Sequence, residues 1–487
     1  MKRILSDMPV GTRKRASCTQ QTQLARLVPG VSPDHRLRGY DPLVQRDDDS
    51  APTNYRPFAA IAASGKTGES VAPRRVVVVG AGAAGTMAAI FAAAGGAQTT
   101  LLERTADGGR KILISGGGRC NILPGHLDES RFVTDSSRNT LRKIVRSWPL
   151  AEQRAFFESE LGLELVEEPA TGKLFPASNR ARDVRDGLLA LATRKGARIL
   201  TGSLVTGVIP IGDGTWQVIR GDEEPLHCDA VVIATGGLSV PATGSDGWGL
   251  TLLSQLGHAM NPTYAALTPV TAQPAPFADL SGVSLPVTVT ATGSGRTATA
   301  TGGFLFTHRG YSGPSVLDVS HVVVRSADEG GEEPARMTVC WTPLDEAGWE
   351  AVLRPSGTRT VGGAVRSEMP DRLASALIAR AGVDPARLLA ELKRSERRAL
   401  VDILVRGDLP WTGNEGYRKA EVTGGGVSLA DIDPRSMESR VHPGLFVCGE
   451  VLDAFGPIGG YNFLWAWATG RAAGIGAAKA GPAARAP

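Results

Sequence analysis

Cysteine is scarce in this chain, with only five among its 487 residues. They lie far apart, and no two have the spacing of a metal-ligand pair; the five are Cys18, Cys120, Cys228, Cys340 and Cys448. An odd, scattered set argues against a disulfide framework and against a metal site. It is typical of a protein of the reducing cytoplasm, which is the location that we expect.

An excess of charge of one sign is also missing. The 53 basic and 49 acidic residues leave a formal net charge of only +4, and the two kinds are interspersed. A protein that binds nucleic acid usually carries a basic patch or stripe. We therefore expect a small-molecule substrate and no nucleic-acid partner.

The chain lacks a long run of large apolar residues. Its two longest apolar stretches, residues 76–97 and 462–478, are dominated by Gly and Ala, as in helices pressed against a sheet rather than in membrane helices. The first 73 residues mix charged residues, Ser and Pro without periodicity and have no signal-peptide core. We expect no membrane segment and a disordered extension over residues 1–73.

What is present is a dinucleotide-binding turn, Arg75-Val-Val-Val-Val-Gly-Ala-Gly-Ala-Ala-Gly85, between an apolar strand and an Ala-rich helix. In such a turn Gly80 permits the sharp bend, Gly82 lets a pyrophosphate approach the backbone, and Gly85 lets the helix pack on the strand. The next strand ends in Glu103, about twenty residues on, where a ribose needs an acceptor. The pattern predicts an α/β, Rossmann-like fold.

Two later segments favour FAD over NAD alone. Residues 443–450 form a short apolar strand that ends in Gly449-Glu450, and this places a carboxylate where large flavoprotein folds meet the ribityl chain. Residues 229–237 form a second apolar strand, which ends in Ala234-Thr235-Gly236, a turn that these folds place beside the cofactor. Because the three segments occur in the right order on one chain, an NAD-only dehydrogenase is the weaker interpretation.

Four further motifs make a resemblance specific. They are Gly109-Arg-Lys-Ile-Leu-Ile-Ser-Gly-Gly-Gly-Arg-Cys-Asn121, Thr307-His-Arg-Gly-Tyr-Ser-Gly-Pro314, Thr423-Gly-Gly-Gly-Val427, and Gly449-Glu-Val-Leu-Asp453 followed by Gly459-Gly-Tyr-Asn462. From about Val76 to Ala478 the chain resembles the family of FAD-dependent oxidoreductases that includes aminoacetone-oxidase-like and dehydro-bile-acid-reductase-like proteins. The family usually has an aliphatic residue at the position of Tyr311, so a shared substrate does not follow from the resemblance.

Together, the motifs and the resemblance imply a set of FAD contacts. The binding is expected to be non-covalent, because the glycine loop from Gly109 to Asn121 contains no histidine. The resemblance places the backbone near Val205 at the adenine. The expected cofactor-binding residues are Gly80, Ala81, Gly82, Ala83, Ala84, Gly85, Glu103, Arg104, Arg110, Lys111, Gly118, Arg119, Cys120, Asn121, Val205, Ala234, Thr235, Gly236, Gly449, Glu450, Gly460, Tyr461 and Asn462.

Some of these assignments have a plain structural alternative. The helix after Gly460 is expected to point its positive N-terminal end at the flavin, where it would stabilise the negative charge of the reduced ring; alternatively it is only a buried helix. Arg110 and Lys111 are expected near the adenosine or the pyrophosphate, or else form a solvated basic pair. Cys120 has no cysteine near it in sequence, so a packed side chain is favoured over a redox-active thiol.

His308 is the expected proton donor or acceptor. It lies on a glycine-punctuated loop at an expected domain junction, beside Arg309, which would orient an anionic or carbonyl substrate. The alternative is that His308 only ties the loop to a sheet. Tyr461 is the next catalytic candidate.

The composition and the periodicity of the sequence change several times along the chain, and these changes predict a discontinuous FAD-binding domain. The expected parts are a first FAD-binding segment at 74–266, an inserted β-rich domain at 267–345, a small helical cap region at 346–419, a second FAD-binding segment at 420–480 and a disordered tail at 481–487. The helical cap rests on apolar residues at helical spacing between 370 and 406.

The favoured function is an FAD enzyme that transfers hydride between a small amine, ketone or enone and either oxygen or NAD(P)H. No second strand, glycine turn and helix unit is found, so a nicotinamide would visit only transiently. Two alternatives remain, a flavin-dependent modifier of a macromolecule such as tRNA and a non-catalytic flavin-binding sensor. The oligomeric state does not follow from the sequence.

Overall fold

The computed structural model describes residue 58 and residues 72–212, 214–330 and 333–479. Apart from residues 58, 72 and 73, the extension over 1–73 and the tail over 481–487 lie outside the described residues. The expected disorder of these two segments therefore stays a prediction.

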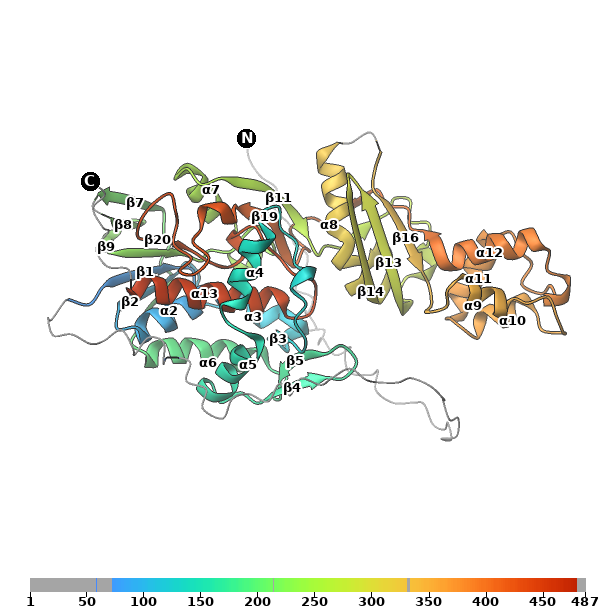
Figure 1. Ribbon diagram of the computed structural model, residues 1–487, viewed down its shortest axis with the longest axis horizontal. Helices are drawn as coiled ribbons and strands as arrows, with labels where there is room; N and C mark the ends of the chain where they lie inside the picture. Colours follow the sequence, from blue (N-terminus) through green and yellow to red (C-terminus); the bar gives the residue numbers. More distant parts are fainter. Residues whose placement is uncertain (1–57, 59–71, 213, 331–332, 480–487) are drawn as a thin grey trace, which may run out of the picture. The chain divides into compact units, whose positions relative to one another are not determined.

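A five-stranded parallel sheet holds the predicted dinucleotide turn (Figure 1). Its strands in spatial order are β20 (Leu445–Val447), β10 (Ala230–Ile233), β1 (Arg75–Val79), β2 (Gln98–Glu103) and β6 (Arg198–Thr201). The valines of β1 are all buried, as expected for a parallel strand covered on both faces. Because β20 comes from the far end of the chain, the predicted α/β fold with a discontinuous Rossmann-like domain is confirmed.

Helices α2 (Ala83–Ala94) and α13 (Tyr461–Lys479) lie together on one side of this sheet (Figure 1). Their backbones touch: a Cβ at Gly470 would lie 2.3 Å from the carbonyl oxygen of Ala84, and one at Gly474 would lie 2.3 Å from that of Ala88. The Gly and Ala content that distinguishes these helices from membrane spans is therefore used for close packing. Among the described residues, no helix is both long and apolar enough to cross a membrane.

On the other side of β1 and β10 lies a three-stranded antiparallel sheet of β7 (Gly207–Gly212), β8 (Thr215–Arg220) and β9 (Glu223–Cys228) (Figure 1). The regular alternation of strands and helices predicts helices on both faces, and for this face the prediction is wrong. Strand β8 alternates buried and partly exposed side chains, with Trp216 and Val218 turned inward. Such a half-buried strand pattern is enough to cover a sheet without a helix.

The remaining elements of this part of the chain surround the parallel sheet. The helices are α3 (Arg110–Ile114), α4 (Arg138–Arg146), α5 (Leu150–Glu160), α6 (Ala181–Arg194) and α7 (Trp248–Gln255). Strands β3 (Leu123–Pro124), β5 (Lys173–Pro176) and β4 (Leu165–Glu168) form a small sheet, and β11 (Met260–Ala266) pairs with β19 (Val422–Val427).

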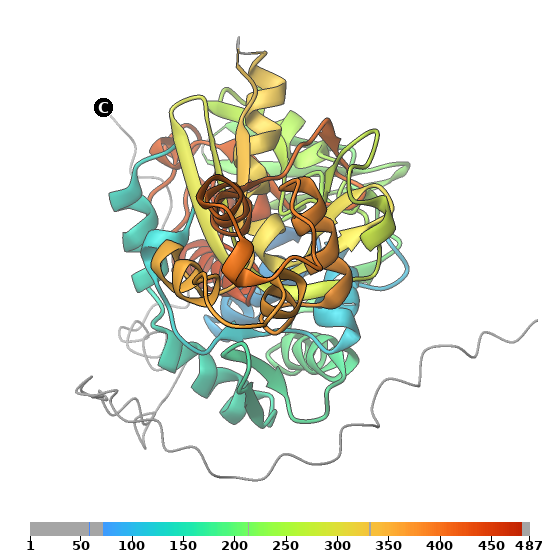
Figure 2. The ribbon, with the colours of Figure 1, turned by 90° about the vertical axis from the view of Figure 1, so that its right-hand side faces the viewer.

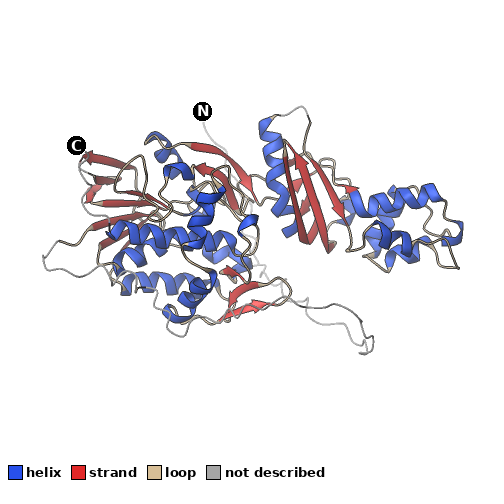
Figure 3. Cartoon of the chain, viewed as in Figure 1, coloured by secondary structure: helices blue, strands red, loops and turns tan. Residues whose placement is uncertain are grey.

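The inserted part contains a seven-stranded antiparallel sheet beside helices (Figure 3). In spatial order its strands are β17 (Gly407–Asp408), β16 (Arg336–Cys340), β13 (Ser284–Gly293), β14 (Arg296–Thr307), β15 (Gly310–Ser312), β12 (Val270–Thr271) and β18 (Gly413–Asn414). Strands β13, β14 and β16 lie within the segment 267–345 that is expected to be β-rich, whereas β17 and β18 come from beyond residue 345. The domain boundaries themselves stay predictions.

Helix α8 (Pro314–Glu329) lies within the segment 267–345 that is expected to be β-rich. It begins at Pro314, directly after Gly313, and buries valines at positions 316, 319, 322 and 323 on one side. A β-branched residue has a low helix propensity, so a valine-rich helix looks strand-like in sequence. Tertiary packing against β13 and β14 outweighs that propensity.

Helices α9 (Glu346–Val352), α10 (Val361–Arg366), α11 (Asp371–Arg380) and α12 (Arg394–Arg406) gather in one group, orange in Figures 1 and 2. They share one continuous hydrophobic core with the seven-stranded sheet. The predicted helical cap and the predicted β-rich domain therefore pack as one body. The parallel sheet and its helices have a separate core.

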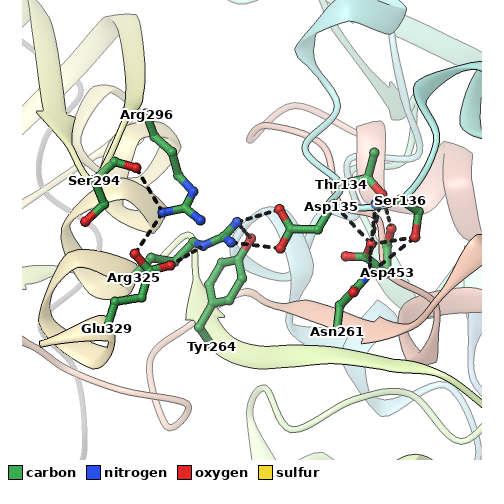
Figure 4. Close-up of polar contacts among 10 residues, drawn as sticks. All are labelled: Thr134, Asp135, Ser136, Asn261, Tyr264, Ser294, Arg296, Arg325, Glu329 and Asp453. Carbon is green, nitrogen blue, oxygen red and sulfur yellow. Dashed lines mark hydrogen bonds and ion pairs between the residues drawn. The ribbon is translucent and has the colours of Figure 1, made fainter. Parts of the chain in front are cut away.

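One face of α8 contacts the nucleotide-binding part through charged and polar groups. Arg325 bonds both carboxylate oxygens of Asp135, at 2.9 and 2.8 Å, and its guanidinium lies over the Tyr264 ring (Figure 4). Beside this pair, one Asp453 carboxylate oxygen accepts hydrogen bonds from the segment 134–136 and from Asn261 (Figure 4). Residues far apart in sequence are held together at this junction.

Candidate functional site

A cavity of about 570 Å³ runs past the carboxyl ends of the parallel strands. In open α/β sheets this is the edge where ligands bind. The volume lies within the range of about 300–1,000 Å³ that is usual for ligand pockets. Most of the expected cofactor-binding residues line it: Gly80, Gly82, Ala83, Ala84, Glu103, Arg104, Arg110, Lys111, Arg119, Asn121, Val205, Ala234, Thr235, Gly236, Gly449, Glu450, Gly460 and Asn462.

The β1–α2 turn has the geometry that a pyrophosphate needs. Gly80 adopts a φ of +103°, and a Cβ there would lie 2.6 Å from the carbonyl oxygen of Ala234. A Cβ on Gly85 would lie 1.8 Å from the carbonyl oxygen of Gly80, so helix and turn touch. By contrast, a Cβ on Gly82 would meet nothing within 4 Å, which leaves open space for a ligand at the N-terminus of α2.

Glu103 fixes this turn from the neighbouring strand. One of its oxygens accepts from the Ala81 amide at 3.0 Å, and the other accepts from the amide and hydroxyl of Thr105. A carboxylate offers about four acceptor sites, so one remains for a ribose hydroxyl. Arg104 forms an ion pair with Asp246 at the same end of the cavity.

Glu450 forms the centre of a polar cluster between the two ends of the cavity. One oxygen accepts from the hydroxyl of Ser239 and from the amide and hydroxyl of Thr423, and the other accepts from Lys111 at 2.7 Å. Burial acts to raise the pKa of Glu450, but the Lys111 charge and these hydrogen bonds outweigh it and hold the pKa below its usual value. The carboxylate therefore stays charged, and its position is fixed between Ser239, which follows β10, and Thr423.

At the opposite end, the glycine pair before α13 enters the cavity wall. A Cβ on Gly460 would lie 2.4 Å from the carbonyl carbon of Leu123. Asn121, with its amide oriented to satisfy both neighbours, accepts from the Gly460 amide and donates to the carbonyl of Leu123. Asn462 holds both backbone groups of Gly456. The predicted polar residues thus shape the start of α13 directly.

Five of the expected cofactor residues lie outside the cavity lining. Ala81 and Gly85 are packed inside the turn, and Gly118 lies in a separate shallow pocket. Burial raises the pKa of the Cys120 thiol to about 12, so this cysteine is inert at neutral pH, in line with the packing interpretation. The Tyr461 hydroxyl bonds the backbone of His126 and Asp128.

His308 and Arg309 also lie away from the cavity wall. They form the exposed turn between β14 and β15, and Arg309 forms an ion pair with Glu415 at 3.5 Å. Neither residue is among the described residues that line the cavity. The catalytic roles of His308, Arg309 and Tyr461 remain predictions, and the structure gives them no contact with this site.

Several residues that line the cavity were not singled out in the sequence. Lys173 and Phe175 lie on β5, a short strand with no motif, and Glu421 directly precedes β19 and its glycine motif. Phe455 and Ile458 belong to the loop before α13. The position of Glu421 two residues before Thr423-Gly-Gly-Gly is a signal that could have been used; for Lys173 the sequence offers none.

The residues present fit FAD as the cofactor. Ser203 and Thr235 line the cavity, and their hydroxyl oxygens are buried without a hydrogen-bond partner among the described residues. A buried polar atom is seldom left unpaired, and a dinucleotide offers hydroxyls and phosphate oxygens to such groups. When bound, FAD would supply hydride chemistry at the end lined by Gly459 and Gly460, because the β1–α2 turn takes the pyrophosphate.

The family model described as the HI0933-like protein Rossmann domain matches residues 74–476. The chain belongs to this family. The resemblance noted in the sequence is confirmed, and with it the class of FAD-dependent oxidoreductases that has a Rossmann FAD-binding fold.

Three curated relatives are similar over almost their whole length. A "3-dehydro-bile acid delta(4,6)-reductase" of Clostridium scindens is 32% identical over 413 residues, which is 83% of this chain and 99% of the relative. Proteins called "Ribosomal RNA dihydrouridine synthase" from Escherichia coli and Haemophilus influenzae are 31% and 30% identical. They match 81% and 82% of this chain and 95% and 97% of their own.

Proposed function

We propose that the protein is an FAD-dependent reductase that saturates a carbon–carbon double bond conjugated to a carbonyl group. The observation that carries this proposal is that relatives with different substrates share one bond chemistry. A dihydrouridine arises when the C5–C6 double bond of a uracil ring, conjugated to the C4 carbonyl, is reduced. The 4,6-diene of a 3-dehydro-bile acid is likewise conjugated to its 3-oxo group.

The cavity supports this reaction class. Glu103, the β1–α2 turn and the α13 N-terminus fit the ribose of the adenosine, the pyrophosphate and the flavin of FAD in that order. The N-terminal end of α13 carries a partial positive charge, which favours the anionic reduced flavin. We infer non-covalent FAD and a nicotinamide that visits transiently as the hydride donor, since no second dinucleotide turn is found in the sequence.

The substrate would share a cavity of about 570 Å³ with the cofactor. A small organic enone is the substrate that we favour. A uracil in ribosomal RNA is the second candidate, supported by the names of two relatives; it would have to enter as a base flipped out of its stack. The expectation of no nucleic-acid partner, based on modest net charge, is therefore not supported.

The test is anaerobic stopped-flow spectroscopy of the purified FAD-loaded protein. NADPH and NADH are mixed with the oxidised protein, and the reduced protein is then mixed with cyclohex-2-enone, with unmodified ribosomal RNA transcript, or with air. Rapid reduction by a nicotinamide and reoxidation by the enone or the RNA, with a saturated product in the mass spectrum, supports the proposal. Flavin that is inert to both nicotinamides but reduced by an amine would identify an oxidase and overturn it.

A further inference from the structure

Glu421 is the unpaired acid at the flavin end of the cavity. The other acids that line the cavity are held elsewhere: Glu103 ties the turn, Asp107 pairs with Arg110, Asp246 pairs with Arg104, and Glu450 pairs with Lys111. The Glu421 side chain is accessible, since it lines the cavity. No ion pair or side-chain hydrogen bond of the described residues occupies its carboxyl group.

Its place is fixed by two backbone contacts. The Glu421 amide donates to the carbonyl of Leu267 at 3.1 Å, and its carbonyl accepts from the hydroxyl of Ser239 at 3.3 Å. Ser239 donates a hydrogen bond to Glu450, and so does Thr423, which lies in β19 two residues after Glu421. Glu421 is therefore attached to the same rigid frame that holds the Glu450 carboxylate.

Two charged groups face Glu421 from other elements. Lys173 reaches it from β5, where its Cε lies 3.7 Å from the position of a Cβ on Gly459. Asp318 reaches it from α8, where it accepts from the Ile458 amide at 2.7 Å and lies 3.6 Å from Arg131. Lys173 and Asp318 thus both contact the segment 458–459 before α13, and the charges of both act on the Glu421 carboxyl group.

This environment favours the protonated form of the Glu421 carboxyl group. Although the Glu421 side chain is accessible from the cavity, the protein atoms packed around it desolvate the carboxyl group and raise its pKa above its usual value. The Lys173 ammonium opposes this effect, and the Asp318 carboxylate adds to it. A raised pKa makes a carboxyl group better suited to general acid catalysis, because more of it carries the proton that is to be donated. Cofactor and substrate would remove further water from the cavity and act in the same direction.

Besides Glu421, the described side chains at the flavin end of the cavity that carry an acidic proton are the Lys173 ammonium and the Arg119 guanidinium. None of the described residues that line the cavity is a His, Tyr or Cys. Arg119, also at this end, pairs with Glu168 at 3.0 Å and stacks over Phe175, and a guanidinium does not release its proton in proteins.

We propose that Glu421 is the proton-exchanging group at the flavin end of the cavity and protonates the α-carbon of the substrate, with Lys173 and Asp318 as positioning residues that set its charge. This inference rests on the proposed reduction of a conjugated double bond. The substrate's β-carbon takes a hydride that originates from a nicotinamide. The π electron pair then forms the new C–H bond at the α-carbon as the O–H bond of Glu421 breaks, and the carboxylate regains its proton from water.

A pH titration of flavin absorbance in the FAD-loaded, oxidised protein tests the proton-exchanging group without any substrate. Wild type should show a spectral transition above the ordinary glutamate pKa of about 4.3, and Glu421→Gln should lack it. Lys173→Met should move the transition to higher pH, since a cation that lowers the pKa is gone. Asp318→Asn should move it to lower pH. Glu391→Gln, an exposed glutamate in the helical group, should leave it in place.

The stopped-flow experiment then tests the chemical step. Glu421→Gln should be reduced by the nicotinamide at the wild-type rate but reoxidised by cyclohex-2-enone or the RNA about 10²–10⁴-fold more slowly. A transition that persists in Glu421→Gln, or wild-type reoxidation of that variant, overturns the inference. If wild type reduces neither probe, the proposed function fails, while the titration still decides whether Glu421 is the proton-exchanging group.

Discussion

Arg325 of α8 and Asp135 of the loop before α4 form a two-pronged ion pair that joins the inserted part to the nucleotide-binding part (Figure 4). The Arg325 side chain is only 11% exposed, while that of Asp135 is 32% exposed. The planar guanidinium group of arginine is well suited to bind both oxygens of a carboxylate through two parallel hydrogen bonds. On the same face of α8, Asp318 bonds the amide of Ile458, which lines the cavity, so this junction and the cavity wall are physically continuous.

Asp135→Asn should destabilise the protein by roughly 1–3 kcal/mol, between the values for exposed and buried ion pairs, because it leaves the Arg325 charge poorly compensated. Chemical denaturation followed by fluorescence measures the change. The matched control is Asp408→Asn, whose partner Arg336 is 69% exposed; its effect should lie within about 0.5 kcal/mol of zero. Equal changes in the free energy of unfolding for the two variants would show that the Arg325–Asp135 pair stabilises the protein no more than an exposed ion pair does.

Local sequence patterns were enough to predict the α/β class and the discontinuous domain. They were also enough to predict where the cofactor cavity lies. Gly80, Gly82 and Gly85 report their roles through spacing alone, and the backbone contacts agree with those roles. Lys173 could not be found in this way, because it reaches the cavity by the packing of a short strand. For His308 the loop motif predicts a catalytic role, and that role stays a prediction, because the residue is exposed on its turn and is not among the described residues that line the cavity.

Non-covalent FAD is expected to colour the purified protein yellow. No His, Tyr or Cys of the described residues lines the cavity to form a link with the flavin. Precipitation with acid should release all of the flavin into the supernatant, where chromatography against authentic FAD identifies it. Flavin that stays with the pellet after acid treatment would contradict the prediction, as would colourless protein that fails to take up added FAD.

Glu450→Ala should weaken FAD binding by about ten- to a hundredfold, the equivalent of one charge-assisted hydrogen bond of roughly 1.5–3 kcal/mol. The change also leaves Lys111 without its partner at 2.7 Å. Fluorescence titration of the apoprotein with FAD gives the two Kd values. Glu438→Ala, which removes a carboxylate that caps the Gly444 amide away from the cavity lining, is the control and should retain wild-type affinity. Equal Kd values for wild type and Glu450→Ala would refute the assignment.

His308→Gln should leave both flavin half-reactions unchanged, because His308 lies on the exposed β14–β15 turn. The catalytic role predicted from the sequence requires instead a loss of about 10²–10⁴-fold in the substrate half-reaction. Stopped-flow rates with the enone or RNA probe separate the two outcomes. A loss of that size with FAD still bound would mean that the turn reaches the reacting centre during turnover.

His321 should make the protein sensitive to acid. Burial, followed by the charges of Arg325 and Arg296, lowers the pKa of this histidine to about 4, and its Nδ1 is buried without a hydrogen-bond partner. In the unfolded chain it titrates near pH 6.5. Between these values the unfolded state binds more protons, so stability is fully present above pH 6.5 and falls as the pH drops, by at most about 1.4 kcal/mol per pH unit.

His321→Leu should flatten that slope in urea denaturation between pH 6.5 and 4.5, whereas His227→Leu, at an exposed position, should not. An unchanged slope in His321→Leu would mean that the loss of stability in acid arises from carboxylates alone.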